Sequence, residues 1–354
     1  MNEQSMENLE VQTTAPAKSQ YLIDLENEVN GDIAGFMPKV IGQGPVKKQL
    51  RQRIKTFLRT RDFAPTLLVA PRGFGKTNIV RGWGKRLPLS TNDSYRPFID
   101  LNGGSLKSIS AFLDAVGQYL AGPDGGGSEV TIFIDEVHAA DKKVRDFLLS
   151  FISPNSEGRA RVLHNGQEFE IDYRMVSVIL ATTDAQKLTE AFKSRCAVIG
   201  LTAYSKSEMA TILNQYIDAF SKKQGVDRVA VTESSENDLV SICRGTPRFA
   251  VKNAENLVSF CANEGITNFD RRAFLKFVKE FDIHPYGLNR NELRVLEALQ
   301  RNGAMTLTAL SASTGLEQQM IRKDCELVMH ENGLIIIDGN RSITSRGREV
   351  LAGW

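Results

Sequence analysis

A short apolar run that leads into a glycine-rich turn constrains the fold more than any other stretch. Residues 66–77 read Thr-Leu-Leu-Val-Ala-Pro-Arg-Gly-Phe-Gly-Lys-Thr, and the segment after them can continue as a helix. A strand, a turn with glycines and a helix form the context of a phosphate-binding loop, in which backbone N–H groups hold phosphate oxygens. Gly73 and Gly75 permit that close approach. We therefore expect Lys76 to supply a cation and Thr77 a hydroxyl for Mg²⁺.

A second stretch predicts the rest of a nucleotide-hydrolysing site. Val130–Ile134 is β-branched and apolar, as expected of a strand buried on both faces of a parallel sheet, and Asp135-Glu136 follow it directly. Beside a phosphate loop, Asp135 can hold Mg²⁺ through water, and Glu136 can orient and deprotonate the attacking water. The alternative is that these two acids only solvate the end of a strand.

The order of the predicted elements divides the chain into four segments. Strands alternate with helices as far as about residue 203, which predicts an α/β fold with a mostly parallel sheet covered on both faces. From Ser205 the pattern is helical, beginning with a capping box to Glu208, and residues 282–287 read as a linker. The expected segments are an acidic, mostly disordered tail (1–35), a P-loop domain (36–203), a helical lid (204–284) and a C-terminal domain (285–354).

Composition indicates a cytoplasmic protein that does not enter a membrane. The sequence contains no apolar run of about 20 residues and no apolar stretch near its start, and its four cysteines lack metal-binding spacing. The formal net charge is +2, but residues 1–35 carry seven acids and one lysine, or −6, which leaves +8 on the remainder. That excess is compatible with nucleic acid.

Two segments are candidates for docking a protein partner. Residues 161–171 have alternating strand character around Asn165-Gly166, which suits a two-residue hairpin turn. A hairpin projecting from a buried core usually contacts another molecule, although it can be a mere connector. In the N-terminal tail, the apolar residues between Tyr21 and Leu25 could form a short docking element, and a solvated tail is the alternative.

The last segment has the element order of a winged helix. Three helices are followed by a predicted hairpin, residues 334–338 and 341–344, around Gly339-Asn340. In the third helix we expect a core face of Met320, Ile321, Leu327 and Val328 and an outward face of Gln318, Gln319, Arg322, Lys323 and Glu326. The candidate DNA contacts are the basic residues on this outer face, on the wing and just beyond it, namely Arg322, Lys323, Arg341, Arg346 and Arg348. A winged helix that binds protein instead is the alternative.

With these pieces in order, the chain from about residue 38 onward resembles the RuvB family, AAA+ motors that drive branch migration of Holliday junctions. The combination is specific, since generic AAA+ proteins rarely join Arg-Gly-Thr-Pro-Arg to a winged helix. The stretches that carry the resemblance are Ile41-Gly-Gln43, Gly73-Phe-Gly-Lys-Thr77, Phe133-Ile-Asp-Glu-Val-His138, Ala181-Thr-Thr183, Arg244-Gly-Thr-Pro-Arg248 and Arg346-Gly-Arg348.

The resemblance implies ATP as the nucleotide and assigns further site residues. Thr183 would be sensor 1, which positions the lytic water, and Arg248 would be sensor 2, which contacts the γ-phosphate from the lid. Arg195 would be an arginine finger that reaches into the neighbouring subunit of a homo-oligomer, a hexameric ring or spiral. The remaining nucleotide contacts would come from the adenine pocket and the two loops, namely Val40, Ile41, Phe74 and Pro247.

The sequence departs from the family pattern in ways that keep a second function open. Ala70 and Arg72 replace a glycine and a proline of the phosphate loop, and the Ser-Arg-Cys motif around Arg195 is more typical of clamp loaders. The leading hypothesis is an oligomeric ATP-driven motor on branched or duplex DNA. The alternative is an ATP switch, such as a clamp loader, helicase loader or transposition regulator, that recruits a partner protein to DNA. A transcription-type regulator is a weaker third hypothesis.

Overall fold

The computed structural model describes residues 19–33, 35–90, 94–121, 127–164 and 167–353. The chain separates into two compact units, and each is described by itself. The first comprises the residues up to Pro38, Gly44–Val69 and Thr77–Ile199, and the second comprises Lys39–Gln43, Ala70–Lys76 and the residues from Gly200 onward. Among the helices described, none combines the length and apolar character that a membrane span requires.

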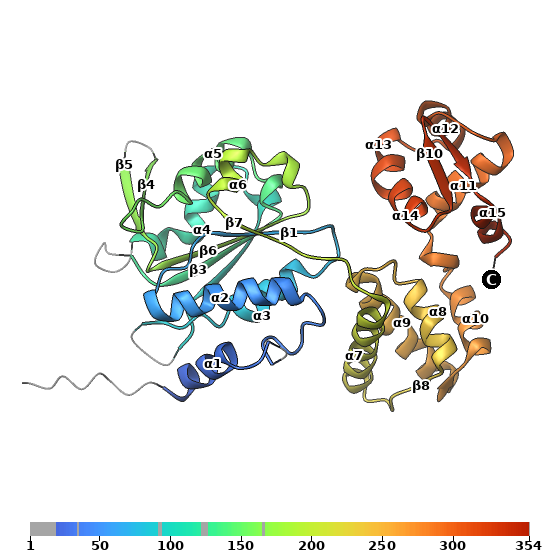
Figure 1. The fold of residues 1–354 in the computed structure, drawn as a ribbon, viewed down its shortest axis with the longest axis horizontal. Helices are drawn as coiled ribbons and strands as arrows, with labels where there is room; N and C mark the ends of the chain where they lie inside the picture. The colour runs from blue at the N-terminus through green and yellow to red at the C-terminus, as the bar shows by residue number, and fades with distance from the viewer. Residues whose placement is uncertain (1–18, 34, 91–93, 122–126, 165–166, 354) are drawn as a thin grey trace, which may run out of the picture. The chain divides into compact units, whose positions relative to one another are not determined.

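The first unit is built on a five-stranded sheet in the order β2-β3-β6-β1-β7 (Figure 1). Its strands are β1 (Thr66–Val69), β2 (Phe98–Asn102), β3 (Val130–Asp135), β6 (Val176–Thr182) and β7 (Ala197–Gly200). β2, β3, β6 and β1 pair in parallel. β6 is buried throughout and β3 at all but its last residue, because helices cover both faces. The predicted parallel α/β sheet is confirmed.

Helices of the first unit lie on both sides of this sheet (Figure 1). On one side, Phe112 and Phe147 join a core with the sheet residues Ile132 and Val178. The elements around the sheet are α1 (Gln20–Asn30), α2 (Gly44–Thr60), α3 (Lys76–Gly84), α4 (Ile109–Ala121), α5 (Lys142–Phe151), α6 (Glu190–Ser194), the antiparallel hairpin β4 (Arg159–His164) and β5 (Gln167–Asp172), and 3-10 turns at Gly103–Ser105, Val137–Ala139 and Ala185–Lys187. The predicted hairpin is thus present, with residues 165–166 at its tip outside the described ranges.

Helix α1 corrects the expectation of a disordered tail for residues 19–33. Leu25 and Val29 are buried, and both oxygens of Glu28 accept from Arg86, at 3.1 and 2.7 Å. The ring of Tyr21 packs edge-on against Tyr95 with centroids 4.5 Å apart. α1 is therefore part of the folded first unit, and the parts of the predicted tail before it lie outside the described residues.

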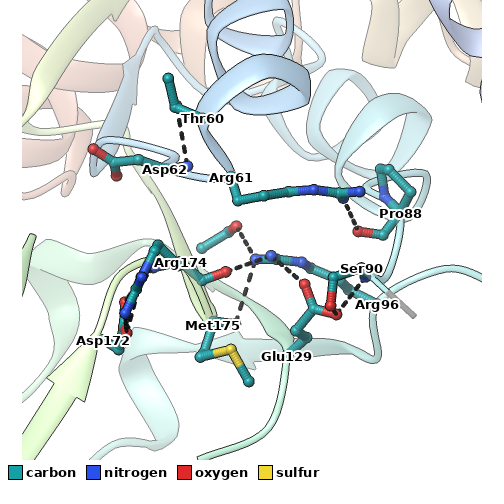
Figure 2. Close-up of polar contacts among 11 residues, drawn as sticks. Thr60, Arg61, Asp62, Pro88, Ser90, Arg96, Glu129, Asp172, Arg174 and Met175 are labelled. Carbon is teal, nitrogen blue, oxygen red and sulfur yellow. Dashed lines mark hydrogen bonds and ion pairs between the residues drawn. The ribbon is translucent and has the colours of Figure 1, made fainter. Parts of the chain in front are cut away.

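A buried ion pair fixes the starts of three neighbouring strands. Arg96, which precedes β2, donates from Nη2 to Glu129 at 2.7 Å, and Glu129 precedes β3. As Figure 2 shows, the same guanidinium points at the carbonyl oxygens of Arg174 and Met175, which precede β6. Burial lowers the pKa of Arg96, against the attraction of Glu129. The contacts align the strands at one end, so that their opposite ends carry the candidate site residues in register.

The second unit begins with a helical lid. Its elements are α7 (Lys206–Gln224), β8 (Ala230–Val231), α8 (Glu233–Ser241), α9 (Pro247–Glu264), β9 (Asn268–Phe269) and α10 (Arg271–Glu280), and a 3-10 turn at Pro285–Gly287 follows. The predicted capping box is confirmed, since Ser205 Oγ accepts from Glu208 N at 3.2 Å and Glu208 Oε2 accepts from Ser205 N at 2.7 Å. A core that includes Leu213, Leu257 and Phe277 holds the helices together.

The last part of the second unit contains the predicted helices and hairpin. Its elements are α11 (Arg290–Asn302), α12 (Leu307–Thr314), α13 (Gln318–Met320), a π-helical turn (Ile321–Cys325), α14 (Glu326–Glu331), β10 (Ile335–Asp338), β11 (Asn340–Ile343) and α15 (Ser345–Leu351). β10 and β11 are antiparallel, and Asn340 pairs with Asp338, so it belongs to the strand and not to the turn. α15 was not anticipated from the sequence.

The π-helical turn overturns the predicted faces of the third helix. Leu327 is 54% exposed, whereas Glu326 and Met329 are buried. A π-turn accommodates one extra residue, which rotates all later side chains by about 100° relative to an uninterrupted α-helix. The expectation that Glu326 faces outward and Leu327 faces the core is therefore wrong. Met320, which precedes the turn, was also expected in the core and is 36% exposed.

Candidate active site

The phosphate loop lies between β1 and α3, as the sequence predicts, and is grouped with the second unit. Gly73 and Gly75 have φ of +90° and +92°, a region that favours glycine. The Lys76 side chain is buried, and its Nζ donates to Ala70 O at 2.8 Å and to Pro71 O at 3.3 Å. The loop therefore has the glycine conformations and the helix start that phosphate binding needs.

The lid contacts this loop within the second unit. The backbone N–H of Arg248 donates to Gly73 O at 3.3 Å, and Tyr204 Oη donates to Phe74 O at 3.0 Å. A Cβ at position 73 would lie 3.1 Å from Arg248 Cβ, so glycine also permits the close approach of the two backbones. Pro247 is the first residue of α9, and Arg248 follows it with an exposed side chain. These two candidates thus lie at the loop.

The segment that carries Val40 and Ile41 is fixed to the start of the lid. Gln43 donates from Nε2 to Thr202 O at 2.8 Å and accepts from Thr202 N at 3.0 Å. Ile41 packs against the lid core, and Val40 is half-buried. Both residues therefore belong to the second unit with the phosphate loop.

In the first unit, oxygen ligands suited to Mg²⁺ lie at the ends of α3 and β3. Thr77 Oγ1 donates to Asp135 Oδ2 at 2.5 Å. Among the described residues, no group of three or more His, Cys, Asp or Glu side chains could enclose a metal ion. A hydroxyl and one carboxylate nevertheless fit Mg²⁺, which takes few protein ligands and completes its shell with water and substrate phosphates.

Glu136 is held in a strained backbone conformation by contacts from two neighbouring strands. Its φ is +51°, which costs a non-glycine residue about 1 kcal/mol or more. Its Oε2 accepts from the N–H of Thr183 at 3.0 Å and from Thr183 Oγ1 at 2.8 Å, because Thr183 directly follows β6 beside β3. A Cβ at Gly103, after β2, would lie only 2.3 Å from Glu136 O. The geometry thus joins Glu136 and Thr183.

His138 is a neighbour of this pair to which the sequence analysis gave no role. Its Nδ1 lies 3.3 Å from Glu136 Oε2 and 2.9 Å from Thr182 Oγ1. Burial lowers the pKa of His138, against the attraction of Glu136, so the imidazole is neutral at pH 7. Its position two residues after Glu136 was the available signal.

Arg195 lies in the first unit at the end of α6, with an exposed side chain. Its Nε donates to Ser153 Oγ at 2.6 Å and its Nη1 donates to Ala191 O at 2.7 Å. These two bonds fix the direction of the guanidinium at the surface.

Of the five candidate DNA contacts, Arg341 is misplaced by the sequence analysis. Its side chain is buried, and Nε donates to Glu326 Oε1 at 2.6 Å. Arg322, Lys323 and Arg348 are exposed. Arg346 is also exposed, but it donates to Asn332 O at 3.3 Å and lies over the ring of Tyr286. Arg341 is buried because the π-helical turn brings Glu326 to the inner side of its helix.

The chain is similar to known proteins over most of its length. Residues 66–204 match the "ATPase family associated with various cellular activities (AAA)". The "Holliday junction branch migration complex subunit RuvB" of Salinispora tropica is 25% identical over 348 residues, which cover 95% of this chain and 90% of the relative. The protein of that name from Fervidobacterium nodosum is 21% identical over 311 residues, or 85% and 82% of the two chains.

Solved structures give the same picture of the fold. The structure of a point mutant of Thermotoga maritima RuvB has a TM-score of 0.69 at 21% identity, covering 89% of this chain and 97% of that one. The structure titled "Thermotoga maritima RuvB Holliday junction branch migration motor" has a TM-score of 0.66 at 22% identity, covering 88% and 95%. The chain is therefore a relative of the RuvB family, with an AAA ATPase domain over residues 66–204.

Proposed function

We propose that this chain is an ATP-driven motor that moves branch points or duplex along DNA, in recombination or repair. The observation that carries the proposal is the join between Glu136 and Thr183 at the ends of adjacent parallel strands, in a chain whose resemblance to branch-migration subunits spans 95% of its length. An ATP-hydrolysing centre and a likeness that continues through the C-terminal segment together favour a motor.

The residues of the site have distinct chemical tasks in this proposal. Lys76 and the amides of the phosphate loop bind phosphate oxygens, and Thr77 and Asp135 hold Mg²⁺. Bound ATP supplies the phosphoanhydride bond whose cleavage drives movement. Glu136 orients the attacking water and accepts its proton, while Thr183 fixes the direction of the Glu136 carboxylate. His138 lies against the same oxygen of that carboxylate.

Arg248 and the adenine-side residues complete the nucleotide contacts. Arg248 reaches the γ-phosphate from the start of α9, where its backbone already meets the phosphate loop. Val40, Ile41, Phe74 and Pro247 line the base and the rim of the loop.

Arg195 acts on a neighbouring subunit in a homo-oligomer, a hexameric ring or spiral. Its exposed position and its bonds to Ser153 and Ala191 support this role, since they present the cation outward in a fixed direction. Hydrolysis then depends on assembly, because the cation stabilises charge on the transferring phosphoryl group only across an interface.

The C-terminal segment, residues 285–354, serves as a winged-helix domain that binds DNA through exposed basic side chains. Arg322, Lys323, Arg346 and Arg348 supply phosphate contacts that position the duplex without reading its sequence. The β4–β5 hairpin is the surface for a protein partner, which the 71% exposure of Leu163 supports.

The decisive experiment is strand exchange on a synthetic four-way junction. The parent protein with ATP and Mg²⁺ should convert the junction to two duplexes, and the Glu136→Gln variant should bind the junction without converting it. ATP hydrolysis and junction binding without any strand movement would contradict the motor. That result would favour a loader or switch that recruits a partner protein to DNA.

A further inference from the structure

A buried ion pair joins the lid to the C-terminal domain inside the second unit. Arg244 donates to Glu292 through Nη2 at 2.5 Å and Nη1 at 3.3 Å. The Glu292 side chain is 0% exposed and that of Arg244 is 10% exposed. The guanidinium also lies 5.0 Å from the centre of the Phe249 ring. The contact is thus enclosed between the start of α9 and the start of α11.

Glu292 has two partners that belong to different parts of the unit. Its Oε2 accepts from the N–H of Asn289 at 2.7 Å, which closes the capping box of α11. Burial raises the pKa of Glu292, against the attraction of Arg244. The carboxylate therefore ties the first turn of the C-terminal domain to an arginine of the lid.

The opposite end of the same short segment meets the phosphate loop. Four residues after Arg244, the backbone N–H of Arg248 donates to Gly73 O at 3.3 Å. A Cβ at Gly73 would lie 3.6 Å from both Cβ and Oγ1 of Thr246. Residues 244–248 thus extend from the nucleotide-binding loop to the C-terminal domain with no intervening element.

The segment begins with two residues in the left-handed backbone region. Arg244 and Gly245 both have positive φ, of +54° and +63°. A non-glycine residue keeps this conformation only where its surroundings fix it, and here the bonds to Glu292 do so. A displacement of one end of the segment is therefore passed to the other end.

A gain in folding stability does not explain the Arg244–Glu292 ion pair. Replacing a buried ion pair with uncharged side chains of similar size is often neutral or stabilising, because desolvation offsets the attraction of the charges. An ion pair that holds two domains in one arrangement has another effect, since it makes the two domains move together.

We propose that residues 244–248 couple the phosphate loop to the C-terminal domain, with Arg244 and Glu292 as positioning residues that anchor the coupling. The nucleotide acts on Gly73 and Arg248, and the anchor passes the displacement to α11. This proposal rests on the ATP-dependent DNA function above, and it deepens it by naming the connection between the two activities.

The test removes both charges together so that no buried charge is left unpaired. The variant Arg244→Met/Glu292→Gln keeps similar volumes and an acceptor for the capping box. The matched control, Arg301→Met/Glu297→Gln, removes an exposed pair with a spacing of 3.5 Å on the same helix. Duplex DNA affinity is measured with a slowly hydrolysed ATP analogue and with ADP, and thermal unfolding and DNA-free ATPase are recorded for each protein.

In the parent and the control, the two nucleotide states should differ in DNA affinity by about fivefold or more, as coupled sites usually do. In the double variant the ratio should fall to about one, with DNA-free ATPase and unfolding temperature near the parent values. An unchanged ratio in a folded double variant overturns the proposal. So does an equal loss of affinity in both nucleotide states, since that is the result of a structural role. If the double variant does not fold, Glu292→Gln alone must lower the ratio.

Hydrogen exchange in the absence of DNA separates this proposal from the proposed function. ATP binding should change the protection of α11 in the parent and leave α11 unchanged in the double variant. The same change in both proteins, or no change in the parent, overturns the coupling. A parent that shows the ATP-dependent change but binds no DNA contradicts the DNA function alone, and the coupling stands.

Discussion

Arg341 on β11 and Glu326 on α14 form a buried ion pair, with Nε 2.6 Å from Oε1. Removing one partner leaves the other charge buried and uncompensated, which typically costs about 3–5 kcal/mol. We predict that Arg341→Ala lowers the unfolding temperature of the protein in a thermal melt. Arg348→Ala, at an exposed arginine, is the control and should leave it near the parent value. Equal melts for both variants would show that the pair contributes little.

The exposed arginines should control the salt dependence of DNA binding. Each phosphate contact that is lost lowers the slope of log affinity against log salt by about 0.9. We predict that Arg322→Gln/Arg348→Gln flattens that slope by nearly two and weakens binding to all duplex sequences alike. Arg301→Gln, on another helix of the domain, is the control. A slope that stays at the parent value would show that the DNA contacts lie elsewhere on the protein.

Two substitutions at the nucleotide site should separate binding from turnover. Lys76→Ala should lose ATP binding, because the cation in the phosphate loop is gone. Glu136→Gln should retain ATP binding and lose about 100-fold or more in kcat, the usual contribution of a general base. Fluorescent-nucleotide titration and phosphate release measure the two quantities. If both variants bind and hydrolyse ATP like the parent, the assignment of the site is wrong.

Arg195 should act between subunits. We predict that Arg195→Ala binds ATP yet hydrolyses it poorly. Mixing it with Glu136→Gln protein should restore part of the ATPase activity, because some interfaces then combine an intact Glu136 from one subunit with an intact Arg195 from its neighbour. Arg145→Ala, at another arginine of the first unit, serves as the control. Full ATPase activity from a dilute sample that is monomeric by light scattering would rule out action in trans.

The ion pair of Glu28 should make the attachment of α1 depend on pH. Burial alone would raise the pKa of Glu28, but Arg86 and the N–H of Met37 outweigh it and hold this pKa below the ordinary value of 4.5. Because the pKa of Glu28 is lower in the folded protein than in the unfolded chain, its carboxylate stabilises the fold at any pH above the unfolded-state pKa. This contribution to the free energy of unfolding is lost as the pH falls through the folded-state pKa.

We therefore predict that the parent has a higher unfolding temperature than Glu28→Gln at pH 7. The difference between the two unfolding temperatures should disappear as the pH falls below about 4.5. Asp24→Asn, which changes an exposed acid on the same helix, is the control. A difference in unfolding temperature that stays constant from pH 7 to acidic pH would show that the Glu28 carboxylate does not cause the pH dependence.

Local patterns in the sequence were sufficient where a signal and its partner lie within a few residues. The capping box of Ser205 and Glu208, the β4–β5 hairpin and the strand before Asp135 were all predicted correctly. Helix α1 was missed because its stability depends on Arg86 and Tyr95, which lie 58 and 74 residues after their partners Glu28 and Tyr21 in the sequence. Composition alone made that segment resemble a solvated tail.

The same distinction applies to the candidate site. The phosphate loop and Glu136 could be found from the order of residues, since backbone geometry decides their conformation. Thr183 was assigned only by resemblance, and His138 had no assignment, because their contacts with Glu136 depend on the pairing of β3 with β6. Arg341 was expected to face solvent because no sequence pattern predicts the π-helical turn.

That turn also affects how residues can be compared between this chain and its relatives. A π-turn is the structural form of a one-residue insertion in a helix. An alignment that continues without a gap through Ile321–Cys325 would therefore match each later position of the helix to the wrong neighbour in a protein whose helix is uninterrupted. Deleting one residue inside this turn should therefore restore an uninterrupted α-helix and still leave Leu327 exposed and Glu326 buried, because the lost residue is the one that the turn accommodates.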